Sequence, residues 1–253
     1  TPAIRTADSA GTIIMEGLPI NALYGWKTNG FFQNYDEIQN AALPTGIDRS
    51  QLRPGDVRYV DLNSDGKIDE NDRTYLGYAF PRYTYGFTYN VKWKGIDFSI
   101  MLQGVLKREN PVRGELVQPF HADYSMTMFD HQLDYWSPQN RDARWPRLGV
   151  SGSVSDTNNW GHTGSDMMLL EGAYMRIKNI QLGYTLPKKW TKKFGCEALR
   201  IYFDTQNPLT WTKNGFVDPE TTSFGNNMSG GADNSVRNYP TLRYFGGGID
   251  LTF

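Results

Sequence analysis

The stretch "DLNSDGKIDEND", residues 61 to 72, carries oxygen-bearing side chains at the spacing of a calcium-binding loop. In such a twelve-residue loop the ligands come from positions 1, 3, 5, 7, 9 and 12. These positions are occupied here by Asp61, Asn63, Asp65, Lys67, Asp69 and Asp72. Lys67 would offer only its backbone carbonyl, as position 7 normally does. The spacing therefore predicts a structural calcium site at these six residues.

Other residues of this loop both support and qualify the prediction. Gly66 stands at position 6, where the sharp turn needs a residue without Cβ, and Ile68 can anchor the loop against packed neighbours. Asp72 replaces the usual Glu, and its shorter arm offers less reach. The flanking segments "GDVRYV" and "RTYLG" have β character, unlike the helices of an EF-hand. An Asx-rich turn whose carboxylates cap backbone amides is the alternative.

Residue patterns for enzyme chemistry are weak in this chain. His121, His131 and His162 lie in one long segment without the spacing of zinc ligands, which favours ordinary polar surface. Asp218 and Glu220 bracket a proline, which is typical of a turn rather than of a glycosidase pair. A phosphate-binding loop, a dinucleotide fingerprint and a G-x-S-x-G elbow are lacking. We therefore expect no enzyme activity.

Tryptophans and the single cysteine offer further candidates. Trp136, Trp145, Trp160 and Trp211 could stack on sugar rings, but packing within loops or at a membrane interface is the favoured explanation. Cys196 is the only cysteine, so no intrachain disulfide can form, and no nearby histidine makes it a nucleophile.

Composition limits the class of protein. A net charge of -1 gives no reason to expect a nucleic-acid or anionic-membrane partner through bulk electrostatics. No run of eighteen apolar residues occurs and mean hydropathy is -0.56, which excludes a transmembrane helix. A transmembrane β-strand needs only about ten residues of alternating polarity. Aromatic residues at 14%, with 26 Gly and 13 Pro, favour β structure. The opening "TPAIRTADSAG" lacks the features of a signal peptide, so a mature or truncated product is expected.

Alternating polarity predicts the strands. Apolar residues recur at every second position in 83–93 and again in 96–106 after Lys94-Gly95, which indicates a tight hairpin. In "AYMRIKNIQLGYTL" the alternation changes phase at Asn179, which indicates a bulge or a strand that begins above a membrane. Two more strands are expected in "ALRIYFDTQNPL" and "LRYFGGGIDLTF", and a weaker sixth within residues 12 to 32.

The connections between these strands alternate in length. Backwards from Phe253 they run long (210–241), short (187–197), long (107–172), short (94–95) and long (33–82). Outer-membrane barrels have long extracellular loops and short periplasmic turns, whereas a soluble β-sandwich, the alternative, has no reason to keep this order. Trp93, Trp190 and Trp211 lie at strand ends, where an interfacial girdle belongs.

The block "PGDVRYVDLNSDGKIDENDRTYLGYAFPRYTYGFTYNVKWKGIDFSIMLQGV" resembles the C-terminal part of SusC-like TonB-dependent outer-membrane transporters. The resemblance continues, in the family's order, over nearly the whole chain. Its other motifs are "EGLPINALYGWKTNGFFQ", "YWSPQNRDARWPRL", "AYMRIKNIQLGYTLPKKW", "RIYFDTQNPLTWT" and "YPTLRYFGGGIDLTF".

This resemblance implies an all-β fold, with residues 1–253 forming about six C-terminal strands of an antiparallel transmembrane barrel of about 22 strands with long extracellular loops. The plug domain and the TonB box would be absent, so the chain is expected to be a fragment of a longer transporter. That transporter would lie in the Gram-negative outer membrane, in contact with its lipid. It would import an oligosaccharide or peptide under a SusD-like surface lipoprotein, energised by the TonB complex.

Within the chain, the resemblance implies that the connections 33–82, 107–172 and 210–241 contact lid or substrate. The alternative class is a secreted, soluble, calcium-binding β domain that recognises glycans. The two differ in one observable: whether the aromatic faces of strands 83–93 and 96–106 point outward as a belt or into a closed core.

Overall fold

The computed structural model describes residues 4–8, 12–20, 22–112, 114, 117–120, 127–161, 164–220 and 239–253. The chain forms two compact units. Unit 1 comprises Thr1–Phe80, Glu109–Leu170 and Thr222–Tyr239, and unit 2 comprises Pro81–Arg108, Glu171–Thr221 and Pro240–Phe253. No helix in the described ranges is long and apolar enough to cross a membrane.

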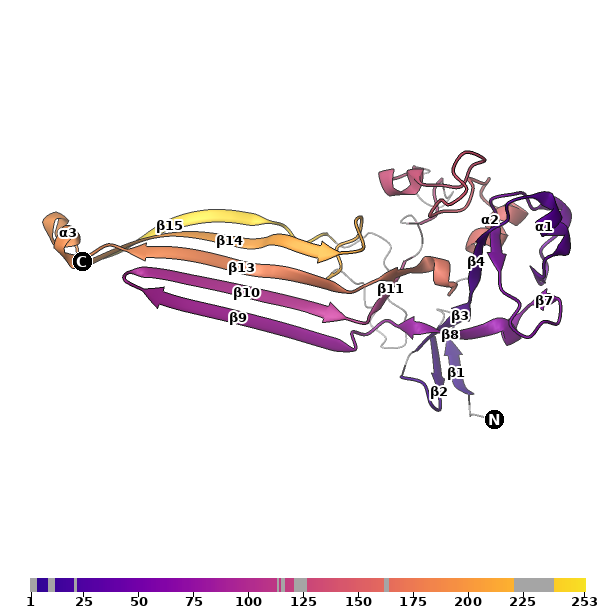
Figure 1. The fold of residues 1–253 in the computed structure, drawn as a ribbon, viewed down its shortest axis with the longest axis horizontal. Helices are drawn as coiled ribbons and strands as arrows, with labels where there is room; N and C mark the ends of the chain where they lie inside the picture. Colours follow the sequence, from indigo (N-terminus) through magenta and orange to yellow (C-terminus); the bar gives the residue numbers. More distant parts are fainter. Residues whose placement is uncertain are drawn as a thin grey trace. The chain divides into compact units, whose positions relative to one another are not determined.

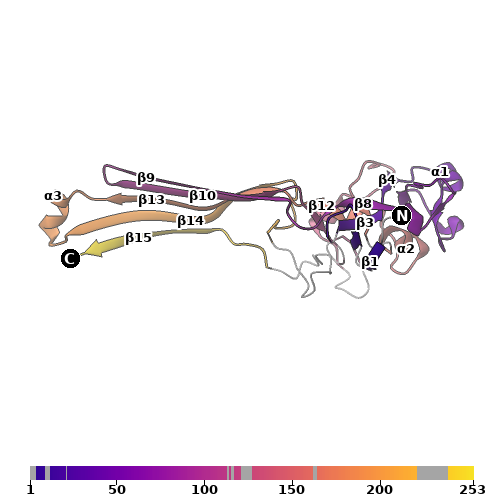
Figure 2. The same ribbon diagram turned by 90° about the horizontal axis from the view of Figure 1, so that it is seen from below.

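Unit 2 is a single antiparallel sheet of five strands in the order β15-β14-β13-β10-β9 (Figure 1). The strands run side by side in one layer when the molecule is turned by 90° (Figure 2). Their bounds are β9 Tyr83–Trp93, β10 Ile96–Leu106, β13 Tyr174–Thr185, β14 Ala198–Thr212 and β15 Tyr244–Thr252. The predicted order of short and long connections is therefore confirmed for these strands.

The β9–β10 hairpin forms as predicted. Lys94 and Gly95 have φ angles of 47° and 86°, and positive φ at both central residues is typical of a type I′ turn. Pairing runs without interruption from Trp93 opposite Ile96 to Tyr83 opposite Leu106. A Cβ on Gly95 would lie 2.7 Å from the carbonyl oxygen of Thr185, so the neighbouring strand also requires glycine there.

The phase change in β13 is a β-bulge. Pairing with β14 shifts between Ile177 and Asn179, and pairing with β10 shifts where Met101 and Leu102 face these same residues. Lys178 is thus the extra residue relative to β10, whereas β14 has one residue more than β13 over the same stretch. The shift moves the residues before it to the opposite face, which is why the alternation reverses there in the sequence.

The two faces of the sheet differ in chemistry and the apolar one is exposed. Directly paired residues share a face, so the register carries the alternating apolar residues of each strand onto the same side. Every residue of β9 is exposed, and Phe87 is 55% accessible. The apolar face includes Phe87, Tyr89, Phe98, Ile100, Leu182, Phe203 and Ile249. The aromatic residues therefore form an outward belt, which is the arrangement of a barrel wall and not of a closed sandwich core.

Unit 1 holds the remaining elements. A four-stranded sheet has the order β1-β2-β3-β8, and short two-stranded sheets pair β4 with β6, β5 with β7 and β11 with β12. The strands are β1 Ile4–Asp8, β2 Thr12–Met15, β3 Ala22–Trp26, β4 Thr28–Phe31, β5 Leu43–Pro44, β6 Val57–Tyr59, β7 Lys67–Ile68, β8 Arg73–Tyr78, β11 Glu109–Pro111 and β12 Leu169–Glu171. The helices are α1 Tyr35–Asn40 and α2 Val154–Trp160; α3, Lys188–Thr191, belongs to unit 2.

Two small hydrophobic clusters form the core of unit 1. One contains Val57, Tyr59, Ile68 and Met167, and the other contains Phe32, Ile38 and Leu52. Segments distant in sequence are joined by Asp56, which is fully buried. Its carboxylate accepts hydrogen bonds from Arg147 Nε at 2.8 Å and Ser155 Oγ at 2.6 Å. The predicted long connections are thus folded structure with a core of their own.

The prediction of a sixth barrel strand within residues 12 to 32 is wrong. That segment does form strands, but β3 pairs with β2 and β8 in unit 1 and not with the five-stranded sheet. This segment does not join the barrel wall because consecutive residues in it are buried, such as Thr12 with Ile13 and Ala22 with Leu23. A barrel-wall strand would alternate instead.

Candidate functional site

The polar face of the unit 2 sheet is organised by charged rows. In one of them, the Arg200 row, Arg200 of β14 stands opposite Asp250 of β15, and Asp97 of β10 stands opposite Gly183 of β13, which lies diagonally from Arg200 because Arg200 itself pairs with Thr185. Arg200 donates to Asp97 at 2.6 Å and to Asp250 at 3.0 Å. Gly183 lies between, and a Cβ there would come within 2.6 Å of both the arginine and the aspartate. One guanidinium therefore neutralises two acids across four strands.

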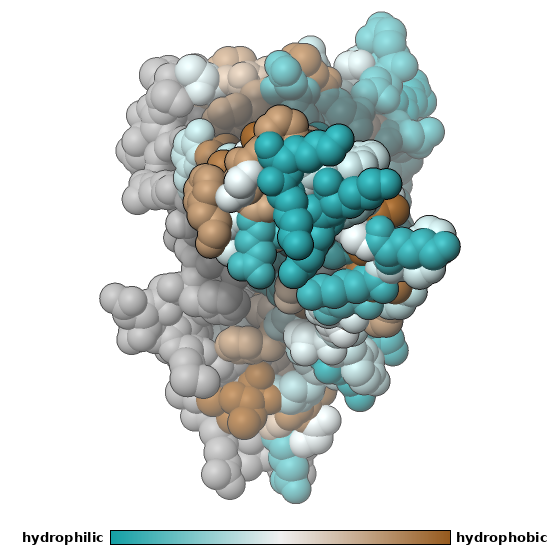
Figure 3. All heavy atoms as spheres, turned by 90° about the vertical axis from the view of Figure 1, so that its left-hand side faces the viewer, coloured by the Kyte–Doolittle hydropathy of each residue, from teal (hydrophilic) through white to brown (hydrophobic). Residues whose placement is uncertain are grey.

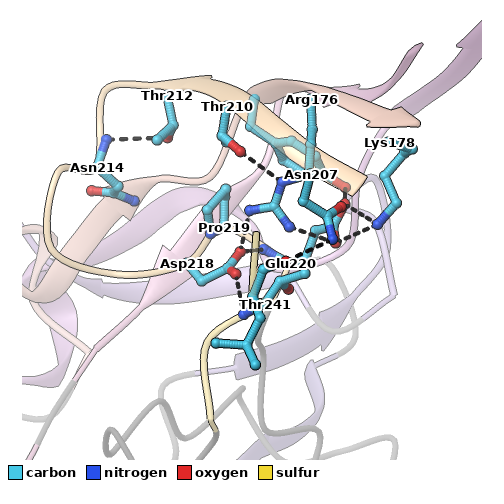
Figure 4. Close-up of polar contacts among 12 residues, drawn as sticks. Arg176, Lys178, Asn207, Thr210, Thr212, Asn214, Asp218, Pro219, Glu220 and Thr241 are labelled. Carbon is cyan, nitrogen blue, oxygen red and sulfur yellow. Dashed lines mark hydrogen bonds and ion pairs between the residues drawn. The ribbon is translucent and has the colours of Figure 1, made fainter. Parts of the chain in front are cut away.

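A second group of charges, the Arg176 cluster, lies where β13 and β14 meet the long connections. It consists of Tyr174 together with Arg176, Lys178, Thr210, Asp218, Glu220 and Thr241, and Figure 4 shows these last six. Tyr174, Arg176 and Lys178 come from β13, and Thr210 from β14. Asp218, Glu220 and Thr241 come from the connection between β14 and β15. All of these residues belong to unit 2.

Arg176 is at the centre of this cluster. It is 4% exposed and donates to Asp218 Oδ1 at 2.7 Å, to Glu220 Oε2 at 2.8 Å and to Thr210 Oγ1 at 2.7 Å. Glu220 also accepts from Lys178 Nζ at 3.0 Å and from the Tyr174 hydroxyl at 3.1 Å. The two carboxylates are thus paired with two cations, which removes the large cost of burying a lone charge.

Asp218 ties together the two ends of the 213–243 connection. Its carboxylate accepts from the backbone N–H of Glu220 at 3.0 Å and of Thr241 at 2.7 Å. Burial alone would raise the pKa of Asp218, but these hydrogen bonds and the one from Arg176 outweigh it and hold the pKa below its ordinary value of 3.8. The Asp-Pro-Glu stretch therefore makes the turn that the sequence favoured. Its pairing with Arg176 gave no sequence signal.

The 61–72 loop lies in unit 1, and its acidic side chains bind its own backbone. Asp61 accepts from the N–H groups of Ser64 at 2.6 Å and Gly66 at 2.8 Å. Asp65 Oδ1 accepts from the N–H of Lys67 at 3.0 Å, and Asn63 Oδ1 from that of Asp65 at 3.0 Å. Lys67 itself lies in β7 with its side chain exposed.

The end of this loop is anchored more firmly. Asp72 is fully buried and accepts from the N–H groups of Leu62 and Asp69, each at 2.8 Å. Asp69 caps the short 3-10 helix that follows it, through the N–H of Asn71 at 2.7 Å. Ile68 is 3% exposed in the cluster with Val57, as its anchoring role required. Gly66 has φ of 86°, the left-handed conformation expected at position 6.

These contacts bear on metal binding in two ways. Within the described ranges, no group of three or more His, Cys, Asp or Glu side chains is arranged to hold a metal ion. Yet a carboxylate has about four lone-pair sites, and Asp61 uses one hydrogen bond on each oxygen. The loop geometry is thus that of the Asx-rich turn, with acceptor capacity left at the exposed residues.

The other residues singled out in the sequence have structural surroundings. Trp136 and Trp145 are buried, and Trp145 Nε1 donates to the carbonyl of His131 at 2.9 Å. Trp160 packs against the Val57 cluster, whereas Trp211 on β14 is exposed. His121 and His162 lie outside the described residues. Cys196 is buried and unpaired.

The chain was compared with known proteins in sequence and in fold. No protein-family model matches the chain. The TonB-dependent receptor P3 of Formosa agariphila is 27% identical over 247 residues, an alignment that covers 95% of this chain and 23% of the receptor. The TonB-dependent receptor SusC of Bacteroides thetaiotaomicron is 27% identical over 233 residues, covering 90% of this chain and 20% of SusC. The chain is related to the SusC-like TonB-dependent receptors.

The relation to SusC-like receptors extends to the fold. A solved structure of the RagAB peptide transporter matches 98% of this chain and 24% of its own, with a TM-score of 0.66 at 21% identity. The five-stranded sheet accordingly has the fold of a portion of a TonB-dependent receptor barrel wall. The chain spans between a fifth and a quarter of the length of receptor P3 and of SusC.

Proposed function

We propose that this chain forms part of the barrel of an outer-membrane transporter that imports a nutrient, an oligosaccharide or a peptide, with energy supplied by the TonB complex. A SusD-like lipoprotein at the cell surface would close over the barrel and trap the substrate. The remainder of the transporter, including the plug, would complete the wall and carry the TonB contact.

One observation carries this proposal: the aromatic face of the unit 2 sheet is exposed on β9 along its whole length. In water such a face would be a costly apolar patch, whereas in a bilayer it meets lipid. Relatives named as TonB-dependent receptors support the same function. The alternative of a soluble, glycan-recognising β domain lacks this support, since such a domain would bury the face.

The structure also suggests which regions do what in this proposal. The unit 2 sheet would present its polar face, with the Arg200 row, to the barrel interior. Unit 1, which contains the connections 33–80 and 109–170, would contribute surface for the lipoprotein or the substrate. The Arg176 cluster would hold the base of the 213–243 connection against the polar face.

The test uses the complete transporter in its native outer membrane. A strain lacking the gene should lose growth on the imported nutrient, identified by comparing oligosaccharides and peptides as sole sources. The same loss should follow disabling TonB, while growth on glucose stays normal as control. Purification of the transporter should bring a SusD-like lipoprotein with it. Unchanged uptake of every nutrient in the deletion strain would overturn the proposal.

A second part of the proposal is that the 61–72 loop holds a structural calcium ion. The ligand spacing supports it, and the exposed side chains of Asn63 and Asp65 keep oxygen lone pairs beyond their present hydrogen bonds. Calcium in the medium could then reach a weak site on the outer surface. The ion would clamp the loop that leads through β8 toward β9.

We expect the double variant Asp61→Ala, Asp65→Ala to abolish calcium-dependent protection of residues 56–72 from proteolysis. The quantity to measure is the ratio of cleavage rates with calcium and with chelator. Loss of the Asp61 hydrogen bonds alone would speed cleavage equally with calcium and with chelator, and would leave the ratio unchanged. Glu70→Gln, which removes an acid at a non-ligand position, is the control and should keep the ratio of the wild type. A ratio of one in the wild type would contradict the proposed calcium site and would not affect the barrel assignment.

A further inference from the structure

The short connection between β13 and β14, residues 186–197, carries a concentration of positive charge. Lys188, Lys189, Lys192 and Lys193 lie on α3 and the 3-10 helix that follows it, and all are exposed. The only acidic contact among them in the described structure is Lys188 with Glu197 at 3.7 Å, and both of these side chains are largely exposed. We call residues 186–197 the lysine turn.

The neighbouring hairpin turn adds to this charge. Thr185 donates its backbone N–H to Gly95 at 2.7 Å, which places the start of the lysine turn beside Lys94. Lys92 lies near the end of β9 in the same region. Two acids nearby, Asp97 and Asp250, are already paired with Arg200. This end of the sheet is thus strongly cationic in a chain whose net charge is only -1.

Exposed aromatic side chains accompany these lysines. Trp190 is 54% exposed and Phe194 is 78% exposed, both within the lysine turn. Trp93 ends β9 at 63% exposure, and Lys94 Nζ lies 4.8 Å from the centroid of its ring. Hydrophilic side chains project from this end of the sheet with hydrophobic ones beside them (Figure 3). Tryptophan flanked by lysine is the composition that anchors proteins at the boundary between lipid tails and head groups.

The lysine turn is held rigidly on the sheet. Thr191 is 1% exposed, and its carbonyl accepts the backbone N–H of Cys196 at 3.2 Å. Leu186 bonds to Leu199 of β14 at 2.8 Å, and Glu197 to Thr252 of β15 at 2.7 Å. The cations are therefore presented from a fixed turn at the end of three strands, so little backbone entropy is lost when they meet a ligand.

We infer that the lysine turn and the adjoining Lys92 and Lys94 bind the phosphate-bearing head groups of anionic phospholipids. The inference rests on the proposed function, because the sheet must span the bilayer for this end to reach head groups. Short connections of outer-membrane barrels face the periplasm, so the lipids belong to the leaflet on that side. The lysines contact the phosphates while Trp93, Trp190 and Phe194 enter the tail boundary.

The test measures lipid retained by the complete transporter. The protein is purified from micelles containing equal phosphatidylglycerol and phosphatidylcholine, and bound lipid is counted by native mass spectrometry. Wild type should retain mainly phosphatidylglycerol. Lys192→Gln with Lys193→Gln should lower that retention about tenfold at low salt, because each lysine near an anionic surface contributes independently. The matched control, Lys107→Gln with Lys213→Gln, removes two exposed lysines at the opposite end of the sheet, one directly after β10 and one directly after β14, and should change nothing.

Three results would overturn the inference. These are equal retention of the two lipids by wild type, equal loss in the two double variants, and displacement of phosphatidylglycerol by millimolar inorganic phosphate, which would indicate a general anion site. Nutrient uptake is measured in parallel. A wild type that imports nutrient without preferring the anionic lipid loses only this inference, whereas a wild type that imports nothing loses the proposed function.

Discussion

Replacing Phe87 with arginine should destabilise the membrane-inserted transporter by about 2–4 kcal/mol. Phe87 lies midway along β9 on the apolar face, and its side chain is 55% exposed. In a barrel wall that position meets lipid tails, where a guanidinium loses its hydration without gaining a partner. The change would be measured as the free energy of unfolding of the complete transporter in lipid bilayers.

The adjacent residue gives the matched control. Thr88 is next along the same strand and points to the polar face, so Thr88→Arg should cost under about 1 kcal/mol, as lumen-facing substitutions do. The contrast between neighbours isolates the direction of the side chain from the choice of strand. If the two variants were equally stable, or if Thr88→Arg were the worse one, the assignment of the apolar face to lipid would be wrong.

Arg176→Ala should cost about 3–5 kcal/mol, since it leaves two largely buried carboxylates, 6% and 19% exposed, without their main partner. Asp218 would keep its hydrogen bonds from the backbone of Glu220 and Thr241, and Glu220 would keep Lys178 and Tyr174. The base of the 213–243 connection should then open. Hydrogen exchange of the backbone N–H groups of Glu220 and Thr241 should accelerate, because in the wild type both donate to the Asp218 carboxylate.

Two further variants separate charge pairing from general damage to β13. Lys178→Ala leaves Arg176 on Glu220 and should have a small effect, because Lys178 is partly exposed. Arg176→Lys keeps the charge but cannot make the several directed bonds of a guanidinium, so an intermediate effect is expected. Unchanged exchange at Thr241 in Arg176→Ala would mean that the connection is held by other contacts.

Local pattern was enough to predict the barrel-wall sheet. Alternation over 83–93 and 96–106, with Lys94-Gly95 between, specifies both strands and their turn because side-chain direction has a period of two. The phase change at Asn179 likewise predicted the bulge at Lys178 in the pairing with β10. These features depend on neighbours in sequence.

Prediction was wrong or incomplete where distant residues decide. Residues 12–32 have strand character, yet their partner strand is β8, and pattern alone does not choose a partner. Asp218 was assigned to a turn, but Arg176 stands 42 residues away, and no spacing rule joins them. The partners of Asp56 were equally unpredictable, since its hydrogen-bond donors Arg147 and Ser155 follow about a hundred residues later. The six predicted calcium ligands stay a prediction.

The Arg200 row has a consequence for how the sheet finds its pairing. A slip of two residues between β13 and β14 would keep every apolar side chain on its proper face, so hydrophobicity cannot reject it. In the native register Arg200 stands opposite Thr185, and a slip that placed it opposite Pro187 would carry its guanidinium away from the gap over Gly183 through which it reaches Asp97. The absence of a Cβ at Gly183 thus lets the ion pair with Asp97 disfavour that slipped register during assembly.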